Sequence, residues 1–271
     1  MSDIVLSGGV RSNLLQLQQT SDLITQTQNR LATGKRVNSA LDNPINYFTA
    51  QNLSGRANDL NSLLDTMSTA INTIQAANNG ISAITKLVQS AQSIVTQAQQ
   101  TTDTNIRATL ASQYDAIRGQ IDQLAQDSGI NGVNLLNGDT LTVTMNETGT
   151  STVSVAGVTD VSNGALAINA STNNWAGATD ITAASTQLTA ALTTLRSQSQ
   201  ALSSNLQTVQ VRQDFTKAMI NTLQTGADNL TLADSNEEGA NLLALQTRQQ
   251  LSTTALSLAA QADQNVLRLF Q

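Results

Sequence analysis

The sequence predicts a mainly α protein, a long antiparallel α-helical coiled-coil bundle that carries a small cap rich in β-hairpins. Three observations predict this fold. Apolar residues recur every three or four positions through most of the 271-residue chain, aromatic residues make up only 2% of it, and its single proline leaves room for very long helices. Because aromatic side chains are so scarce, a thick globular core is not expected.

The first predicted helix runs from about Val10 to Thr33 and ends at Gly34, since glycine commonly follows the last turn of a helix. Its residues share an apolar stripe, which consists of Leu6, Val10, Leu14, Leu17, Ile24 and Leu31. A compact link, KRVNSALDN, follows. Asn43 then precedes Pro44 in the pattern of an N-cap followed by a proline in the first helical turn.

The second predicted helix spans residues 44–100, which at 1.5 Å per residue is a rod of roughly 85 Å. Its apolar rhythm has two irregularities, Asn78 and Gly80, which we interpret as tolerated imperfections. Asp103 or Thr104 is the expected cap of a third helix, which folds back on the second and ends at Gly129. The apolar face of this third helix consists of Ile106, Leu110, Tyr114, Ile117, Ile121 and Leu124.

The character of the chain changes after two Asn-Gly turns in residues 131–138. From there to about Ala178, apolar residues alternate with threonine and serine, and glycine recurs, which predicts a small β-rich region. Helix resumes near Leu188 and continues to about Leu232. We interpret the acidic cluster in residues 234–238 as a solvated link at a helix N-terminus rather than a metal site.

The last predicted helix, residues 242–271, carries two adjacent apolar stripes. The first stripe consists of Leu251, Ala255, Leu258, Ala262, Val266 and Leu269, and the second of Leu242, Leu245, Leu256, Ala260, Leu267 and Phe270. A helix with two stripes needs two neighbours. We expect the N-terminal helix to be one and another molecule to be the second, so that both ends are poorly ordered in the monomer and fold on assembly. A soluble coiled-coil hairpin closed on itself is the alternative.

Composition removes several classes of function. The chain has no histidine and no cysteine, so the commonest zinc ligands, the usual general base and the thiol nucleophile are missing. No enzyme activity and no cofactor is expected. A net charge of −6 with only 13 basic residues argues against nucleic acid as a partner. No apolar run approaches the roughly 18 residues needed for membrane insertion, and the N-terminus lacks the pattern of a cleavable signal peptide.

Three motifs resemble bacterial flagellins. The run LATGKRVNSALDN, residues 31–43, is similar to the signature near the start of these proteins. The run NGVNLL, residues 131–136, is similar to the turn that follows their second long helix, and the run QNVLRLF, residues 264–270, is similar to their closing segment. The resemblance covers about residues 1–137 and 180–271. The matching positions of the link signature are Gly34, Arg36, Asn38 and Asp42.

The resemblance implies a subunit that self-polymerises into the bacterial flagellar filament, which is used for swimming motility. Residues 1–43 and 234–271 are then D0-like terminal helices with their links, residues 44–137 and 180–233 are D1-like, and residues 138–179 are a small variable cap. The apolar stripes become the polymer interface. The polar arc of the last helix becomes a candidate lining of the central channel, with Gln250, Ser257, Gln261, Gln264 and Arg268.

The resemblance also implies secretion through the flagellar type III export channel and an extracellular location in the filament. The implied partners are other copies of the chain, an export chaperone, and the filament cap and junction proteins. Gln89 and Ser93 occupy the positions of an arginine and a leucine that Toll-like receptor 5 recognises in enteric flagellins, so weak recognition is expected. A hook-filament junction protein and a soluble coiled-coil signalling module are the alternative functions.

Overall fold

The computed structural model describes residues 8–269, with only the backbone described for Asp263 and for residues 266–269. Leu6 and Phe270, both predicted interface residues, therefore lie outside the described residues. The chain divides into two compact units. The terminal unit comprises Met1–Gly55 and Thr222–Gln271, and the central unit comprises Arg56–Asn221.

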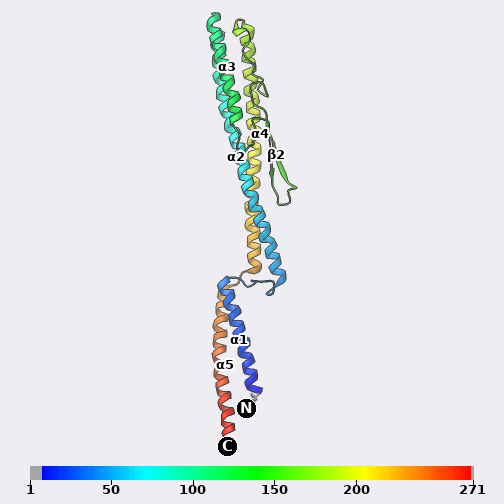
Figure 1. Ribbon diagram of the computed structural model, residues 1–271, viewed down its shortest axis with the longest axis vertical. Coiled ribbons are helices and arrows are strands. Elements are labelled where there is room, and N and C mark those ends of the chain that lie inside the picture. Colours follow the sequence, from blue (N-terminus) through cyan, green and yellow to red (C-terminus); the bar gives the residue numbers. More distant parts are fainter. Residues whose placement is uncertain (1–7, 270–271) are drawn as a thin grey trace. The chain divides into compact units, whose positions relative to one another are not determined.

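In the terminal unit, α1 (Gly8–Thr33) and α5 (Ser235–Leu269) pack side by side (Figure 1). The buried residues of α1 fall on one face and are Val10, Thr20, Ile24 and Thr27. Thr20 fits on this apolar face because its hydroxyl donates to the carbonyl of Gln16, one helical turn earlier, at 2.8 Å. The predicted pairing of the first and last helices is confirmed.

The link between α1 and α2 (Pro44–Gln100) lies along the end of α4 (Ala178–Thr231). Gly34 ends α1 with a φ of +67°, a conformation that glycine adopts without strain. The backbone N–H of Arg36 then donates to the carbonyl of Thr231 at 2.7 Å. Asn43 is the predicted N-cap of α2, since its side-chain oxygen accepts from the N–H of Asn46 at 3.0 Å.

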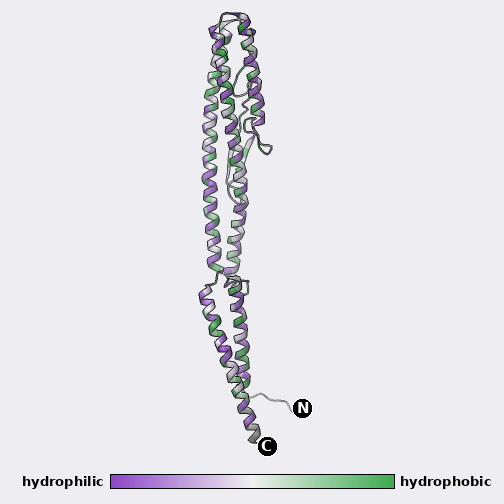
Figure 2. Ribbon diagram, turned by 90° about the vertical axis from the view of Figure 1, so that its left-hand side faces the viewer, coloured by the Kyte–Doolittle hydropathy of each residue, from purple (hydrophilic) through white to green (hydrophobic). Residues whose placement is uncertain are grey.

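The central unit is a bundle in which α2 and α4 pack with α3 (Thr104–Asp127) around one hydrophobic core. Buried residues recur at every seventh position, which is the spacing of a coiled coil. On α2 they are Leu60, Met67, Ile74, Ile81, Val88 and Val95, and on α4 they are Ile181, Leu188, Leu195, Leu202 and Val209. Figure 2 shows the resulting alternation of hydrophobic and hydrophilic residues along the helices. The predicted helical bundle is confirmed, although α4 begins ten residues before Leu188, at Ala178.

A two-stranded antiparallel sheet completes the central unit, with β1 (Thr140–Thr144) paired to β2 (Thr152–Ala156). Val143 and Val155 are fully buried and belong to the same core as the helices. The hairpin therefore lies along the side of the helices and does not close their end (Figure 1). An isolated hairpin is at best marginally stable, so its apolar face needs the helix surface as cover. A short 3-10 helix, η1 (Asn173–Trp175), precedes α4.

Gly80 and Asn78, which we interpreted from the sequence as tolerated imperfections of α2, both have structural roles. A Cβ atom at Gly80 would overlap the Oγ atom of Ser128 and lie 2.6 Å from a methyl carbon of Leu136. Only glycine fits where the residues after α3 return to α2. The side-chain oxygen of Asn78 accepts from the hydroxyl of Ser199 on α4 at 3.4 Å. The interpretation of these two residues was therefore wrong.

Candidate assembly surface

The two predicted stripes of α5 differ in exposure. On the second stripe Leu242, Leu245 and Leu256 are half-buried. On the first stripe Leu251 is 66% exposed and Leu258 is 62% exposed, and Ala255 and Ala262 between and beyond them are also exposed. In the terminal unit, one stripe of α5 is thus partly covered while the other faces solvent.

The predicted stripe of α1 is covered along most of its length. Val10 and Ile24 are buried, Leu17 and Leu31 are half-buried, and Leu14 is 40% exposed. Three further leucines that the sequence prediction missed are also exposed, and these are Leu15, Leu23 and Leu243. The spacing of Leu15 and Leu23, two turns apart on a helix rich in glutamine, is the signal that would have found two of them.

A charged pair joins the two helices where α5 begins. The Nη1 atom of Arg30 lies 3.0 Å from Oε1 of Glu238, whose side chain is only 8% exposed. Asp234 caps the helix by accepting from the N–H groups of Asn236 and Glu237. The interpretation of residues 234–238 as a solvated link at a helix N-terminus was correct for Asp234, which is exposed and caps α5. It was wrong for Glu238, which is buried against α1.

Two of the four signature residues of the link, Asn38 and Asp42, take part in one hydrogen-bonded turn. Asp42 accepts from the N–H groups of Asn38 and Ser39 at 3.0 and 2.9 Å, and the Asn38 amide donates to the carbonyl of Lys35 at 3.0 Å. The backbone hydrogen bond from Ser39, followed by that from Asn38, holds the pKa of Asp42 below its usual value. The Arg36 side chain is exposed. The signature therefore fixes the chain path between α1 and α2.

Two groups of exposed apolar residues lie outside the α1–α5 pair. The first, which we name the link patch, consists of Leu41, Ile45 and Phe48, which are 96%, 77% and 58% exposed. The second, the α4 patch, consists of Val211 and Phe215, one helical turn apart and 62% and 56% exposed. The chain has only three phenylalanines. That two of them are exposed indicates surfaces for binding.

The other predicted site residues lie on exposed helix surfaces. Gln250, Ser257, Gln261 and Gln264 are exposed on α5, whereas the side chain of Arg268 is not among those described. Gln89 and Ser93 are exposed one turn apart on α2, where the Ser93 hydroxyl donates to the carbonyl of Gln89 at 3.2 Å.

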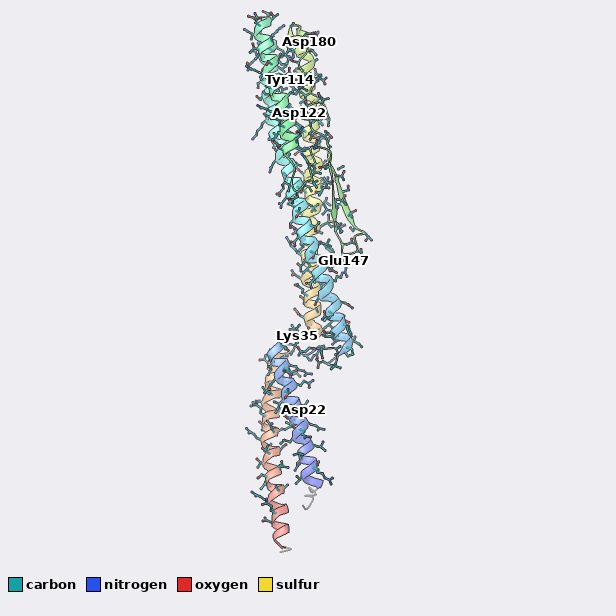
Figure 3. All side chains as sticks on the ribbon, viewed as in Figure 1. Asp22, Lys35, Tyr114, Asp122, Glu147 and Asp180 are labelled. Atoms are coloured by element: carbon teal, nitrogen blue, oxygen red, sulfur yellow. The ribbon has the colours of Figure 1, made fainter. Side chains whose placement is uncertain are left out.

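The charged side chains that Figure 3 labels in the central unit do not cluster. Within the central unit, Asp122, Glu147 and Asp180 lie at separate places (Figure 3). No group of three or more His, Cys, Asp or Glu side chains suited to a metal ion occurs among the described residues. Within residues 8–269, none of the helices is long and apolar enough to cross a membrane.

The family model for the bacterial flagellin N-terminal helical region matches residues 10–140. Flagellin FljK and flagellin FljM of Caulobacter vibrioides are each 32% identical to the chain, over 100% of this chain and 99% of each relative. The flagellin of Brucella melitensis biotype 1 is 25% identical over 100% of both chains.

Proposed function

We propose that the first stripe of α5 is the contact that drives polymerisation of this chain. The chain belongs to the bacterial flagellins, which are structural proteins that self-polymerise into the flagellar filament for motility. The observation that carries this proposal is the unequal cover of the two stripes. The α5 helix packs along α1 with Leu242, Leu245 and Leu256 of its second stripe half-buried, and it leaves Leu251, Ala255 and Leu258 in solvent. A helix of 35 residues beside one of 26 also extends past the described end of its partner.

We infer that the stripe packs on a different surface of the next subunit. Such a contact is heterologous, so each added subunit would present the same free surface again and assembly would continue without closing. We infer that the link patch and the α4 patch pack on neighbouring copies of the chain as well. Exposed aromatic and branched apolar residues of this kind commonly dominate the energy of an interface.

The roles of the remaining segments follow as part of the same proposal. Residues 1–43 and 234–271 form a D0-like inner layer, and the D1-like segments with residues 138–179 surround it. The exposed amide and hydroxyl groups of Gln250, Ser257, Gln261 and Gln264 line the channel. An uncharged wall of this kind would let unfolded subunits pass during export. The export chaperone, the filament cap and the junction proteins are the proposed partners, and the location is the filament outside the cell.

We also propose that Toll-like receptor 5 recognises this chain weakly. Gln89 and Ser93 are exposed on α2 but offer neither a cation nor an apolar anchor. Loss of such an anchor at the centre of an interface commonly costs about 2 kcal/mol or more. In a cell-based receptor assay, the chain is expected to signal far less than an enteric flagellin at equal monomer concentration. Equal potency would contradict the proposal.

The proposed function is tested by seeded polymerisation. Full-length protein and a truncation that lacks residues 242–271 are mixed with short filament fragments, sedimented, and imaged in negative stain. The full-length chain is expected to grow long filaments, whereas the truncation stays in the supernatant. If both chains remain small ordered dimers, then α5 closes on itself, and a junction protein or a soluble coiled-coil module is the better account.

A further inference from the structure

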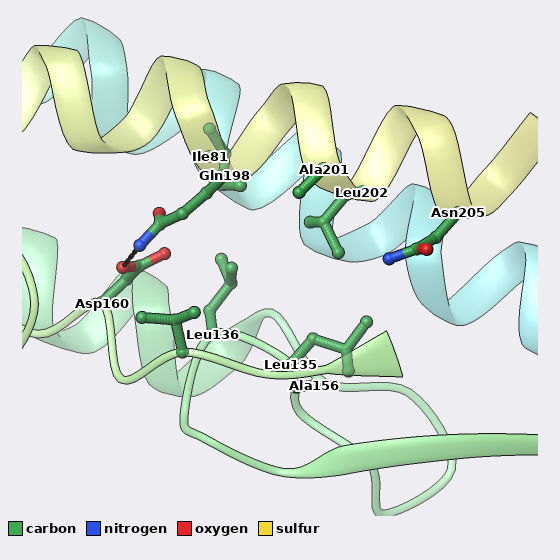
Figure 4. Close-up of a pocket in the computed structure, with 10 residues that line it drawn as sticks. Ile81, Leu135, Leu136, Ala156, Asp160, Gln198, Ala201, Leu202 and Asn205 are labelled. Atoms are coloured by element: carbon green, nitrogen blue, oxygen red, sulfur yellow. Dashed lines mark hydrogen bonds between the residues drawn. The ribbon is translucent and has the colours of Figure 1, made fainter. Parts of the chain in front are cut away.

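A small pocket in the central unit holds a buried carboxyl group among apolar side chains. The pocket has a volume of about 70 Å³ and lies between α4 and the segment that precedes and follows the sheet. Its apolar walls include Ile81, Leu135, Leu136, Ala156, Val158 and Leu202. Figure 4 shows Asp160 and Gln198 meeting at one end of it. Asp160 is fully buried, and its backbone N–H donates to the carbonyl of Leu136 at 2.8 Å.

The Asp160–Gln198 pair has fewer hydrogen-bond donors than acceptors. Nε2 of Gln198 donates to Oδ1 of Asp160 at 2.8 Å. Oδ2 of Asp160 and Oε1 of Gln198 are both buried without a partner. An ionised carboxylate offers only acceptors, so it cannot satisfy the amide oxygen. Leaving buried acceptors unpaired is costly, and here two of them lie on neighbouring side chains.

Two other aspartates of the central unit show the opposite arrangement. Asp122 accepts from both the N–H and the hydroxyl of Ser162, and Asp115 accepts in the same way from Ser171. Each of these carboxylates therefore has a hydrogen-bond donor for both of its oxygens. Asp160 has no backbone donor of this kind among the described contacts, which sets it apart.

We propose that Asp160 and Gln198 form a proton-binding site, in which uptake of one proton on the Asp160 carboxylate supplies the missing donor and fastens the chain after β2 to α4. The proton comes from solvent and binds Oδ2, which becomes an O–H group that donates to Oε1 of Gln198. The carboxyl group becomes neutral, and no other bond forms or breaks. The site is independent of the polymer contact proposed above.

Asp160 is the one charged residue among the described residues that line the pocket. The residues that α2 and α4 contribute to the pocket, and those of the segment around the sheet, include no other titratable group. On α3, Asp122 and Arg118 face the neighbouring Ser162 and form hydrogen bonds with it. Burial raises the pKa of Asp160 to about 6, and the hydrogen bond from Gln198 acts in the opposite direction.

The direction of the pH effect follows from this arrangement. The folded chain holds the proton up to about pH 6, whereas an unfolded aspartate releases it near its ordinary pKa of 3.8. The folded state thus binds more protons between these values, and stability rises as the pH falls from 7 to 5. The chain has no histidine, so no other side chain ordinarily titrates in this window. The unfolding equilibrium constant is expected to fall about tenfold between pH 7.0 and 5.0.

The test is urea unfolding of the full-length monomer, followed by the fluorescence of Trp175. This is the only tryptophan of the chain, and it is buried in the same core as the pocket. D160N provides a permanent donor and no charge, so its unfolding constant is expected to be constant between pH 7.0 and 5.0. At pH 7.0 it should be about a hundredfold below that of the wild type, given a pKa raised by about two units. The matched control D122N loses a satisfied carboxylate and is expected to unfold more readily at both pH values.

A second variant keeps the test decisive if D160N does not fold. Q198M removes both the N–H that binds Oδ1 and the amide oxygen that accepts from the protonated carboxyl, so at pH 5.0 it is expected to unfold more readily than the wild type. A wild-type unfolding constant that stays unchanged between pH 7.0 and 5.0 would overturn the proposal. So would a D160N variant that follows the wild-type pH dependence.

Discussion

The double variant L251Q/L258Q is expected to lose seeded polymerisation at concentrations where the wild type assembles. The two leucines are 66% and 62% exposed in the terminal unit, so assembly has most of their apolar surface left to bury. Full burial of a leucine contributes roughly 1.5–3 kcal/mol, so burial of the exposed part of this pair contributes about 2–4 kcal/mol per subunit to the free energy of assembly. Loss of that contribution raises the critical concentration roughly 30- to 1,000-fold. Glutamine keeps the helix, because it is a good helix former. The measurement is the protein left in the supernatant after sedimentation.

The matched control is T253Q/S257Q, which places the same side chain twice on the polar arc of the same helix. Both positions are exposed. This control is expected to polymerise at the wild-type critical concentration. If L251Q/L258Q assembles as readily as this control, then the first stripe of α5 is not the polymer contact.

Removing the charge of Arg30 is expected to loosen the α1–α5 pair. In R30M the apolar stem remains, but the Glu238 carboxylate is left buried without its cation. Removing one partner of a buried ion pair typically costs 3–5 kcal/mol of stability. Because the Arg30 side chain is 27% exposed and so partly screened by water, we expect the α1–α5 pair to lose about 3 kcal/mol of stability, at the lower end of this range. Hydrogen exchange of the α5 backbone amides is the measurement, and protection in the first turns of α5 should fall.

K217M is the matched control for R30M. Lys217 lies 3.6 Å from Asp214 in an exposed pair, where removal of the cation is expected to change stability by no more than about 0.5 kcal/mol. The swapped variant R30E/E238R should recover part of the lost protection, because the pair is restored with its charges exchanged. Unchanged exchange of α5 in R30M would show that the ion pair does not hold the two helices together.

The fold was predictable because its signals are local and repeated. Met67, Ile74 and Ile81 recur at the coiled-coil spacing, and such a pattern leaves few alternatives to a helical bundle. The caps at Asn43 and Asp103 were predictable for the same reason, since each contacts backbone groups only two or three residues away. The two stripes of α5 also follow from periodicity alone.

The remaining features depend on contacts between residues far apart in the sequence. Arg30 and Glu238 are 208 positions apart, and Asp160 is 38 positions from Gln198. No local pattern distinguishes these residues from other charged or amide side chains. Gly80 also depends on distant residues, because Ser128 and Leu136 leave no space for a Cβ atom at its position. The link patch went unrecognised because Leu41 lies in a turn whereas Ile45 and Phe48 lie in the first turns of α2, so no single periodic pattern joins the three residues.

The most direct test of the central claim compares the reactivity of one thiol in the monomer and in the filament. The chain has no cysteine, so A255C introduces a unique thiol between Leu251 and Leu258 on the exposed stripe. The account predicts rapid alkylation in the monomer and strong protection in the filament, whereas T150C, in the exposed hairpin turn, reacts equally fast in both. Equal reactivity of A255C in monomer and filament would contradict the claim that this stripe of α5 is buried between subunits.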